Sequence, residues 1–584
     1  MQKKWTVKDA PNKEAVKELK KTLGVSTVVA EMLVRRDILT FEKAKAFFRP
    51  HLDQLHDPFL MKDMRKAVER LSVAFENKEK VLVYGDYDVD GTTAVALVYT
   101  FLNDHGFNCE FYIPDRYDEG YGVSIKGIDY ACNNDFSLII SLDCGIKAID
   151  QVEYAKSKKV DFIICDHHTP GNDLPDAIVL DPKRQDCDYP YKELSGCGVG
   201  FKLVTAYSIA KNSSLENCYN QLDLLAISIA ADIVPITGEN RTLCALGLEK
   251  INKRPRVGIS KMLSLAQKEL PLKLTDIVFG IAPRINAAGR MGDAKKAVVL
   301  LMNQHTTKVK ELAEEIHTAN EERKAADEQI TAEALAQIEE DPDHEARVTT
   351  VVFDKDWHKG VIGIVASRLI EVHYRPTVVF SQNNDEQNSL TASARSVKGI
   401  NVYNVLENCS DLLEQFGGHY YAAGLKILPE NLAKFKLRFE KEVRSLLDGE
   451  SLQAEQIIEK TLDFNEIFKP GENLFAVPQI KRVLDQFEPH GPGNMKPVFL
   501  SHNVYAKQAK LLKDQHLKLT LFQPKSNVMI EAILFNRPEA YTWVNSGDPF
   551  SIAYTLEVNE WKGKRTLQMN LKDLRMVNKT VETA

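Results

Sequence analysis

Hydrophobic and polar positions alternate in blocks along the middle of this chain. Short apolar runs are separated by segments with helical periodicity; the runs are VLVY at 81–84, SLIISL at 137–142, DFIIC at 161–165 and AIVL at 177–180. Continuous apolar runs between helices are typical of parallel strands that are buried on both faces. The pattern therefore predicts a doubly wound α/β domain, which we place at residues 61–306.

The segments that flank this domain are predicted to be helical. Residues 1–60 carry helical periodicity and end in a stretch rich in aromatic residues and proline, which indicates a small helical lead-in. Residues 307–340 hold no glycine or proline and many strong helix formers. At 1.5 Å per residue that helix would be about 50 Å long, and we expect it, as segment 307–341, to join two lobes.

The C-terminal part of the chain divides into two patterns. Residues 342–454 form a second α/β unit, indicated by the apolar runs TTVVF at 349–353 and PTVVF at 376–380. Residues 455–584 carry strand patterns with few helical signals, such as HLKLTLF at 516–522, NVMIEAILF at 527–535 and FSIAYTLEV at 550–558. About five such strands favour a small antiparallel barrel. The expected fold class is α/β, with two lobes, a connecting helix and a C-terminal β-barrel.

Composition and charge restrict the possible locations and partners. The 584 residues include 75 Lys+Arg and 82 Asp+Glu, so the net charge of −7 provides no overall basic field, and a nucleic-acid site must be a local patch. The nine cysteines are odd in number, include no CxxC pair and in several cases lie inside apolar runs, which is typical of reduced, mostly buried thiols in a reducing compartment. No stretch approaches the roughly 18 apolar residues that span a bilayer, so we expect a cytoplasmic protein without a membrane segment.

Three acids stand at alternate positions directly after the first predicted strand: Asp86, Asp88 and Asp90. In α/β sheets, ligands bind outside the carboxyl ends of the strands. Acids so close together raise one another's pKa values unless a cation is present. The alternative is that these residues form a turn and cap a helix starting at Thr92, which explains one acid more easily than three.

The following strand exits repeat this arrangement. Asp143 follows the second apolar run, and Asp166-His167-His168 follows the third. Apart from these strand exits, a further acid, Asp232, follows the apolar stretch LLAISIAA. A single Asp in such a place is usually a cap, but neighbouring parallel strands bring these exits to one edge. Carboxylates and imidazole without thiolate pairs favour Mn²⁺ or Mg²⁺. Two such ions about 3.5–4 Å apart activate water and stabilise a leaving oxygen in phosphoryl transfer.

Eight motifs in order resemble the DHH phosphoesterase superfamily and, within it, the RecJ family of single-strand-specific 5′→3′ DNA exonucleases. They are GDYDVDG at 85–91, SLDCG at 141–145, DHH at 166–168, AADIVP at 230–235, PRINAAGRMGD at 283–293, WHKGVIGIVASRL at 357–369, SARS at 393–396 and GGHYYAAG at 417–424. The resemblance covers nearly the whole chain. It implies a DHH domain, a DHHA1-like lobe that closes over the substrate, and a C-terminal OB-fold that binds single strands.

The resemblance also implies roles for individual residues. The metal ligands would be Asp88, Asp90, Asp143, His167 and Asp232. Asp143 would bridge two ions and so act in catalysis, with His168 beside them as an acid or electrostatic stabiliser. Tyr84 departs from the pattern, because many small DHH phosphatases have His at that place, four residues before Asp88. Asp86 could supply a compensating oxygen to the first metal site.

Phosphate binding is expected mainly from the second lobe. Ser393, Arg395 and His419, together with the Gly417-Gly418 backbone, offer neutral and cationic donors, although a strand end and a tight turn would also explain these motifs. By resemblance, Arg116 would reach a terminal 5′-phosphate. Further contacts with the strand backbone would come from Arg284, Asn286 and Arg290. His358 either faces this site or is a structural histidine.

Aromatic and basic residues alternate in the predicted barrel. They are Tyr505, Phe522, Phe535, Trp543, Tyr554 and Trp561, interleaved with Lys510, Lys513, Lys518, Arg537, Lys562, Lys564 and Arg565. Bases that stack on aromatic rings along a basic groove are how OB-folds hold single strands. A barrel this small needs most of its aromatic rings as core; we expect Trp561 and the 562–565 loop to be exposed, and the sequence does not sort the other rings.

The leading hypothesis is a metal-dependent 5′→3′ exonuclease that hydrolyses single-stranded DNA in repair and recombination by a two-metal mechanism. The resemblance implies single-stranded DNA, a helicase and a single-strand-binding protein as partners, and we expect a monomer. One alternative is a DHH phosphodiesterase for very short oligonucleotides or cyclic dinucleotides, which would need neither the barrel nor the N-terminal extension. Another is a non-catalytic DNA-binding scaffold of the replication-factor type, and the intact acids and His pair argue against it.

Overall fold

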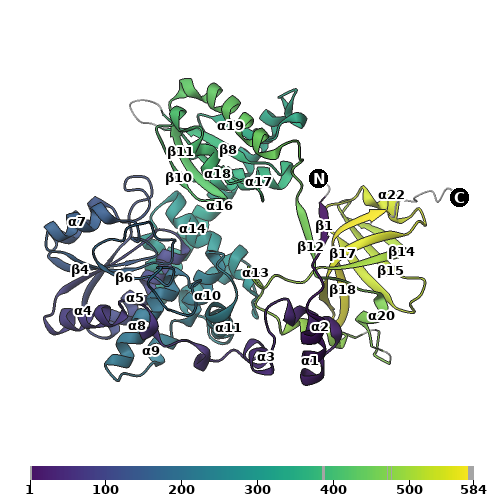
Figure 1. Cartoon of the computed structure of the whole chain (residues 1–584), viewed down its shortest axis with the longest axis horizontal. Helices are drawn as coiled ribbons and strands as arrows, with labels where there is room; N and C mark the ends of the chain where they lie inside the picture. The colour runs from purple at the N-terminus through teal and green to yellow at the C-terminus, as the bar shows by residue number, and fades with distance from the viewer. Residues whose placement is uncertain (1–2, 384–388, 470, 475, 577–584) are drawn as a thin grey trace. The chain divides into compact units, whose positions relative to one another are not determined.

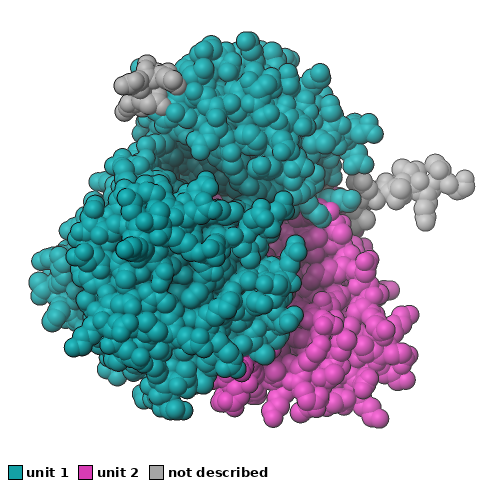
Figure 2. Space-filling model, turned by 60° about the vertical axis from the view of Figure 1, so that its left-hand side comes forward, with its two compact units in different colours: residues 1–4, 58–232, 250–454 teal, residues 5–57, 233–249, 455–584 magenta. Residues whose placement is uncertain are grey.

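The computed structural model (Figure 1) describes residues 3–383, 389–469, 471–474 and 476–576. The chain forms two compact units (Figure 2). Unit 1 consists of residues 1–4, 58–232 and 250–454, and unit 2 of residues 5–57, 233–249 and 455–584. The five segments expected from the sequence are thus grouped into two units, and residues 577–584 of the last segment lie outside the described part.

The first lobe of unit 1 is built on a parallel sheet of five strands. Their order is β3 (Asn108–Tyr112), β2 (Lys80–Gly85), β4 (Phe136–Leu142), β5 (Asp161–Cys165) and β6 (Ile178–Leu180). This confirms the four predicted strands and adds β3. The edge strand β3 has the sequence NCEFY, whose residues are exposed or half-buried, so it lacks the apolar run that revealed the others.

Helices cover both faces of this sheet, as predicted for a doubly wound fold (Figure 1). Helices α6 (Ile125–Asn133) and α7 (Ile149–Ser157) share a buried core with Leu82, Ile139 and Ile164 on one face. The other face is covered by α4 (Met64–Glu76), α5 (Val89–Asp104) and α8 (Gly196–Ala210).

The strand register places all the strand exits at one edge. Gly85 lies beside Leu142, Leu142 beside Cys165, and Cys165 beside Leu180. The residues that follow each of these positions therefore emerge side by side. This is the edge at which the sequence predicted a metal site.

The connecting helix α16 runs from Thr306 to Glu339, in agreement with the prediction. Its buried polar residues include Asp327, which is fully buried. The Arg368 guanidinium of α17 (Ile362–His373) donates to both oxygens of this carboxylate, from Nε at 2.8 Å and from Nη2 at 2.8 Å. The pair fixes the connecting helix to the second lobe, because a bidentate contact restrains orientation as well as distance.

The second lobe of unit 1 has a mixed five-stranded sheet. Its order is β10 (Gln415–Gly418), β11 (Ala422–Ile427), β9 (Leu390–Arg395), β8 (Thr377–Gln382) and β7 (Thr350–Asp354). Only β7 and β8 are parallel; the other neighbours are antiparallel. Helices α16 and α17 pack on one face, and α18 (Val402–Glu407) and α19 (Leu432–Leu447) on the other. The predicted α/β lobe is confirmed.

The main body of unit 2 is a closed β-barrel. The strands follow the order β14 (Phe499–Leu512), β15 (His516–Phe522), β16 (Met529–Leu534), β18 (Lys564–Met576) and β17 (Phe550–Trp561), and β17 pairs back with β14. This is the five-stranded Greek-key arrangement of an OB-fold. It confirms the expected barrel, although the pairing is not antiparallel throughout, because β16 and β18 are parallel.

The N-terminal segment packs into this barrel unit. It forms the predicted helices, α1 (Lys13–Leu23), α2 (Thr27–Val34) and α3 (Phe41–Phe48), and an unpredicted strand β1 (Lys4–Val7) that pairs with β12 (Glu455–Ile458). Met32 and Leu33 share a hydrophobic core with Phe464 and Phe487. The lead-in therefore depends for its core on residues more than four hundred positions away.

Two further sequence features can be compared with the structure. None of the helices in the described ranges is long and apolar enough to cross a membrane. The nine cysteines are free, and all but Cys109 and Cys132 are buried, which confirms the expectation of buried thiols.

Candidate active site

The loop after β2 is shaped by its acids and by one glycine. Asp88 caps helix α5, because its Oδ1 accepts a hydrogen bond of 3.0 Å from the Gly91 N–H. A β-carbon on Gly91 would lie 2.3 Å from the Asp86 carbonyl oxygen, so only glycine allows this close passage. The helix begins at Val89, not at the expected Thr92, so Asp90 lies in its first turn. Capping explains Asp88 but neither of the other two acids.

Asp90 is held in place by a helix from elsewhere in the chain. Its Oδ2 accepts from the Gly196 N–H at 2.6 Å and its Oδ1 from the Cys197 N–H at 2.8 Å, both in the first turn of α8. The Ser228 hydroxyl donates to Oδ1 at 2.7 Å. A carboxylate at a helix N-terminus is stabilised by the free N–H groups and the helix dipole. These contacts fix the orientation of Asp90 inside the protein.

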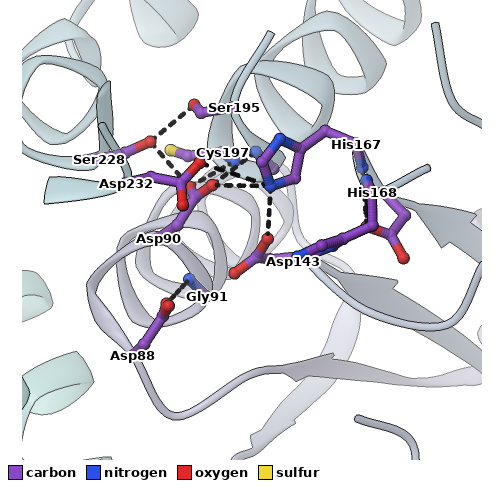
Figure 3. Close-up of polar contacts among 12 residues, drawn as sticks. Asp88, Asp90, Gly91, Asp143, His167, His168, Ser195, Cys197, Ser228 and Asp232 are labelled. Atoms are coloured by element: carbon purple, nitrogen blue, oxygen red, sulfur yellow. Dashed lines mark hydrogen bonds and ion pairs between the residues drawn. The ribbon is translucent and has the colours of Figure 1, made fainter. Parts of the chain in front are cut away.

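His167 lies at the centre of the predicted cluster (Figure 3). Its Nε2 is 3.1 Å from Asp143 Oδ1, 3.5 Å from Asp232 Oδ2 and 3.7 Å from Asp90 Oδ2. Burial lowers the pKa of His167, which favours the neutral imidazole that binds metals. The structure thus brings together one nitrogen and three carboxylates from four separate elements.

The ligand atoms fall into groups of the size that a metal ion needs. The groups are Asp86 with Asp88 and Asp143, Asp90 with His167 and Asp232, and Asp143 with His167 and His168, and within each group the ligand atoms lie within 4.8 Å of one another. Asp143 and His167 each belong to two of these groups, and of the two only Asp143 has a carboxylate that can bind two ions at once. This arrangement suits two adjacent cations that share one carboxylate.

Several ligand atoms in this cluster are buried without a hydrogen bond. Among the described residues, Asp86 Oδ1, Asp143 Oδ1, Asp232 Oδ2 and both ring nitrogens of His167 have no hydrogen-bond partner. Buried polar atoms are normally satisfied, so such atoms indicate a missing ion or ligand. The atoms left over are oxygens and imidazole nitrogens, and this donor set fits Mn²⁺ or Mg²⁺.

The pKa values of the carboxylates also indicate a cation site. Burial raises the pKa of Asp143 well above its ordinary value, and the nearby Asp90 and Asp88 raise it further. Burial and Asp90 likewise raise the pKa of Asp232 to about 8. These acids stay ionised together only if positive charge enters the cluster.

His168 is oriented by two contacts at the rim of the cluster. Its Nδ1 donates to Asp166 Oδ1 at 2.7 Å, and its Nε2 lies 3.1 Å from the Tyr121 hydroxyl. Burial lowers the pKa of His168, but Asp166 outweighs it and raises the pKa to about 9. Burial raises the pKa of Asp166, but the hydrogen bond and charge of His168 outweigh it and lower the pKa to about 2. The pair therefore presents a protonated imidazole next to the cluster.

Tyr84, which replaces the histidine of small DHH phosphatases, has a structural role here. It is 1% exposed, its hydroxyl donates to the Gly122 carbonyl at 2.9 Å, and it accepts from the Ser124 N–H at 3.1 Å. Its ring stacks on Tyr112. The side chain anchors the loop that carries Tyr121, and Asp86 remains grouped with Asp88 and Asp143.

Three of the predicted arginines form a second cluster, from both lobes of unit 1. Arg116 stacks over the Tyr87 ring at 4.7 Å, Arg290 donates to the Gly360 carbonyl at 2.9 Å, and Arg395 donates to the Ser393 hydroxyl at 2.8 Å. Burial, Arg116 and Arg395 lower the pKa of Arg290 to about 10. Burial and Arg116 also lower the pKa of Arg395. Guanidinium groups this close together favour binding of an anion such as phosphate.

The first turn of α17 lies against Ser393 and Arg395. A β-carbon on Gly363 would be 2.9 Å from the Ser393 hydroxyl and 2.9 Å from Arg395 Nη2. The glycine lets the free N–H groups of the helix start approach these side chains. A helix N-terminus beside an arginine and a hydroxyl is a suitable environment for phosphate.

The remaining predicted residues take different positions. His419 is exposed in the turn between β10 and β11, and its pKa is lowered by burial and by the nearby cations Lys147 and His168 of the first lobe. Asn286 is half-buried on α14 (Ala282–Met291). His358 accepts the Gly360 N–H at Nδ1, at 3.1 Å, as a structural histidine would.

Arg284 does not join the arginine cluster. It is 5% exposed, and its Nη1 donates to the Gly280 carbonyl in the preceding turn. Its Nη2 lies 3.5 Å from the Leu265 carbonyl. The side chain thus points into the first lobe, away from the surface where a strand backbone could reach it.

The barrel can be compared with the expectation for its aromatic rings. Trp561 is 71% exposed, and residues 562–565 are exposed as well, which confirms the prediction for this loop. Tyr554 is fully buried and belongs to the core. Tyr505 and Phe522 are half-buried and stack with ring centroids 5.5 Å apart.

Some residues of the site were missed by sequence reasoning. The residues that donate hydrogen bonds to Asp90, namely Gly196, Cys197 and Ser228, were not predicted. The sequence feature that could have indicated the helix start is the serine before the glycine-rich segment in SGCGVG. Asp181, at the exit of β6, is fully buried, and burial raises its pKa to about 7. Asp181 could have been predicted as a site residue, because it is an acid directly after the fourth apolar run.

Comparison with known proteins agrees with this division of the chain. Residues 80–229 match the DHH family, N-terminal domain, residues 345–445 match the DHHA1 domain, and residues 476–573 match the RecJ OB domain. The chain is 34% identical over 574 residues to the single-stranded-DNA-specific exonuclease RecJ of Bacillus subtilis (strain 168), covering 98% of this chain and 70% of that protein. Identity to the RecJ of Escherichia coli (strain K12) is 32% over 532 residues, 88% of this chain and 90% of that protein.

Solved structures show the same similarity. RecJ from Thermus thermophilus in complex with Mn²⁺ has a TM-score of 0.82 and 27% identity, over 98% of this chain and 80% of that chain. The structure of that protein in complex with Mg²⁺ has a TM-score of 0.76 and 26% identity, over 98% of this chain and 78% of that chain. The expected DHH domain, DHHA1 lobe and OB-fold are confirmed.

Proposed function

The chain belongs to the RecJ family of DHH proteins, and we propose that it hydrolyses single-stranded DNA from the 5′ end in a metal-dependent reaction. The observation that carries this proposal is the placement of His167 Nε2 among the carboxylates of Asp143, Asp232 and Asp90, in the same unit as a cluster of three arginines. The first cluster suits metal-assisted hydrolysis, and the second suits recognition of phosphate.

Five residues would hold two Mn²⁺ or Mg²⁺ ions: Asp88, Asp90, Asp143, His167 and Asp232. Asp143 would be shared, as its membership of two ligand groups supports. Such a pair supplies activation of water and stabilisation of the leaving oxygen in phosphodiester hydrolysis. The α8 N–H groups keep Asp90 in one orientation, so the chain contributes a ligand set that is ordered before substrate binds.

His168 would act beside this centre as an acid or electrostatic stabiliser. Asp166 holds the imidazole by a 2.7 Å hydrogen bond and keeps it protonated. A protonated imidazole can donate to a phosphate oxygen on which negative charge develops, or to the departing O3′. This role needs only a donor that is charged and fixed at the rim.

The direction of attack would be set by recognition of the 5′ end. Arg116, Ser393 and Arg395 would bind a terminal 5′-phosphate and so place the first phosphodiester bond at the acids. Arg290, Asn286 and His419 would contact the strand backbone. The burial of Arg284 gives no support to the same role for that residue.

The barrel would hold the strand through Trp561 and the basic loop 562–565, because base stacking and phosphate contacts do not depend on the DNA sequence.

We also propose a role in DNA repair and recombination. The protein would act in the cytoplasm as a monomer, together with a helicase and a single-strand-binding protein. These proposals rest on the family membership. The division into segments 1–60, 61–306, 307–341, 342–454 and 455–584 also remains our proposal.

Digestion of 5′-labelled and 3′-labelled single strands with Mn²⁺, Mg²⁺ or EDTA tests the main proposal. We expect early release of the 5′ label, slow loss of the 3′ label, and no reaction in EDTA. Binding without hydrolysis under all metal conditions would indicate a DNA-binding scaffold instead. Hydrolysis of only the shortest oligonucleotides would indicate a phosphodiesterase for small substrates.

A further inference from the structure

A cavity of about 390 Å³ lies in the second lobe, on residues that the proposed reaction does not use. Its walls come from the end of α16, the segment that leads into β7, and α19; they include Ile338, Thr350, Val351, Arg375, Lys436 and Leu437. The volume is within the range of small-molecule sites, about 300–1,000 Å³. Apolar and cationic side chains thus meet in one cavity.

The cavity is lined by more cations than acids: Arg347, Arg375 and Lys436 against Asp341 and Glu440. Its two acids are already engaged: Asp341 accepts from Arg347 at 3.0 Å, and Glu440 accepts from the Thr349 N–H at 3.0 Å and pairs with Arg444. Within the described part of the chain, no carboxylate lies within 4.0 Å of the cationic nitrogens of Arg375 or Lys436.

Arg375 is the more constrained of these two cations. It is 7% exposed, and its guanidinium donates only to neutral groups: the Thr350 hydroxyl at 2.7 Å and the carbonyls of His344 and Arg347 at 2.6 and 2.9 Å. Burial lowers its pKa, and the more distant carboxylates of Glu440 and Asp341 offset part of that effect. A buried cation whose hydrogen bonds go only to neutral groups favours an anionic ligand, and arginine is suited to phosphate.

The cavity also contains an open position on a sheet edge. Strand β7 is the last in its sheet, and Thr350 directs its N–H to Pro376, on the side of β8. The neighbouring outward positions are covered, since the Thr349 N–H donates to Glu440 and the main chain of Phe353 bonds to the Gln337 side chain.

Alternation along the strand places the N–H and C=O of Val351 on that same outward side, between the two covered positions. Val351 lines the cavity. Among the described residues, this leaves one donor and one acceptor of the strand open to a ligand. A peptide strand would need several such positions, whereas a nucleobase presents a donor and an acceptor on one planar edge.

We propose that this cavity binds a nucleoside monophosphate, with the base on the open edge at Val351 and the phosphate on Arg375 and Lys436. The aliphatic side chains of Ile338 and Leu437 would flank the sugar and base. Mononucleotides are the product of the reaction proposed above, so the site would respond to product; that last point alone rests on the proposed function. Binding itself is independent of it.

Isothermal titration calorimetry of the full chain in EDTA tests binding with dAMP, deoxyadenosine and inorganic phosphate. We expect dAMP to bind at least about tenfold more tightly than either fragment, because the base and the phosphate each contribute contacts. Lys436→Glu should weaken dAMP binding by about tenfold or more, since it reverses a charge at the phosphate. Lys434→Glu, an exposed change on the same helix outside the cavity, is the matched control and should bind like the wild type.

Two further measurements separate this cavity from the catalytic cleft. In an Arg395→Ala background, which removes any dAMP held at the proposed 5′-phosphate site, dAMP should still bind and Lys436→Glu should still weaken that binding by about tenfold; dAMP should also slow hydrogen exchange of the Val351 amide. The proposal is overturned if Arg395→Ala abolishes binding, if folded Lys436→Glu binds like the wild type, or if inorganic phosphate binds as tightly as dAMP. Unchanged exchange at Val351 would overturn the placement of the base. None of these outcomes depends on whether the protein cuts DNA.

Discussion

Gly196 lies so close to Asp143 that a β-carbon on Gly196 would come within 2.6 Å of the Asp143 β-carbon. The same glycine donates its N–H to Asp90 at 2.6 Å. The start of α8 thus contacts two of the proposed ligands at once. The position of the acids depends on a residue that has no side chain to contribute.

Gly196→Ala should reduce hydrolysis by about 100-fold, because ligand displacements near 1 Å have effects of that size. Overpacking should also lower the free energy of unfolding by about 1–3 kcal/mol. Single-turnover rates and urea denaturation measure the two effects. Gly198→Ala on the same helix is the control, since its β-carbon would meet Leu194 at an ordinary 3.4 Å. Equal rates for the two variants would contradict the close-packing argument.

Asp143→Ala should abolish hydrolysis while DNA binding persists, because it removes the carboxylate that two ligand groups share. In EDTA the variant should be as stable as the wild type or more stable, since a buried acid that other acids repel has been removed. The increase in Tm that Mn²⁺ causes in the wild type should disappear. Turnover at the wild-type rate in the folded variant would rule out the shared-ligand assignment.

Arg395→Ala should weaken binding of 5′-phosphorylated strands more than that of 5′-hydroxyl strands, because a guanidinium contributes charge-assisted hydrogen bonds to the terminal phosphate. Arg395→Lys should restore only part of the difference, since lysine lacks the planar fork. The KM values for the two substrates measure this selectivity. A similar loss on both substrates would show that Arg395 does not recognise the end group.

Removing the barrel from about residue 456 onward is not a clean test of its role, because Phe464 and Phe487 complete the core around Met32 and Leu33. Substitution of Trp561 and the 562–565 loop avoids this problem. Trp561→Ala should cost about 1–3 kcal/mol in binding of a long strand. Replacing Lys562, Lys564 and Arg565 by alanine should make the binding less dependent on salt, by up to about 0.7 in slope per lost phosphate contact.

Fluorescence anisotropy of a long labelled strand at several salt concentrations measures both effects. Trp543→Ala is the control for Trp561, since this ring is 39% exposed on α22 (Ala540–Val544). An unchanged affinity and salt slope in the loop variants would show that this part of the barrel does not hold the strand.

His490 should make unit 2 sensitive to acid. Burial lowers its pKa from 6.5 to about 4, and the cations Lys496, Arg36 and Arg241 contribute to this shift. Below pH 6.5, His490 therefore binds a proton in the unfolded chain but stays neutral in the folded chain. The contribution to the free energy of unfolding is complete above pH 6.5 and falls by about 1.4 kcal/mol per pH unit down to about pH 4. Urea denaturation of wild type and His490→Asn between pH 7 and 5 should show a flatter profile for the variant; identical slopes would contradict the assignment.

The sequence alone determined the buried strands of the first sheet and the connecting helix. The four buried strands of the first sheet and the boundaries of α16 could be predicted because local periodicity reports which faces are buried. The convergence of Asp88, Asp143 and His167 was also predictable, since parallel strands place their carboxyl ends at one edge. The eight sequence motifs then identified the family to which the chain is similar.

Tertiary packing alone decided the rest. Arg284 and Arg290 share α14, yet one points into the lobe and the other joins the arginine cluster, because packing determines which helix face meets the cleft. Asp90 gains the N–H groups of α8 from more than a hundred residues away. The buried residues of helices α1 to α3 pack in one hydrophobic core with residues of the barrel. Contacts between distant segments leave no period in the sequence, so only the folded chain reveals them.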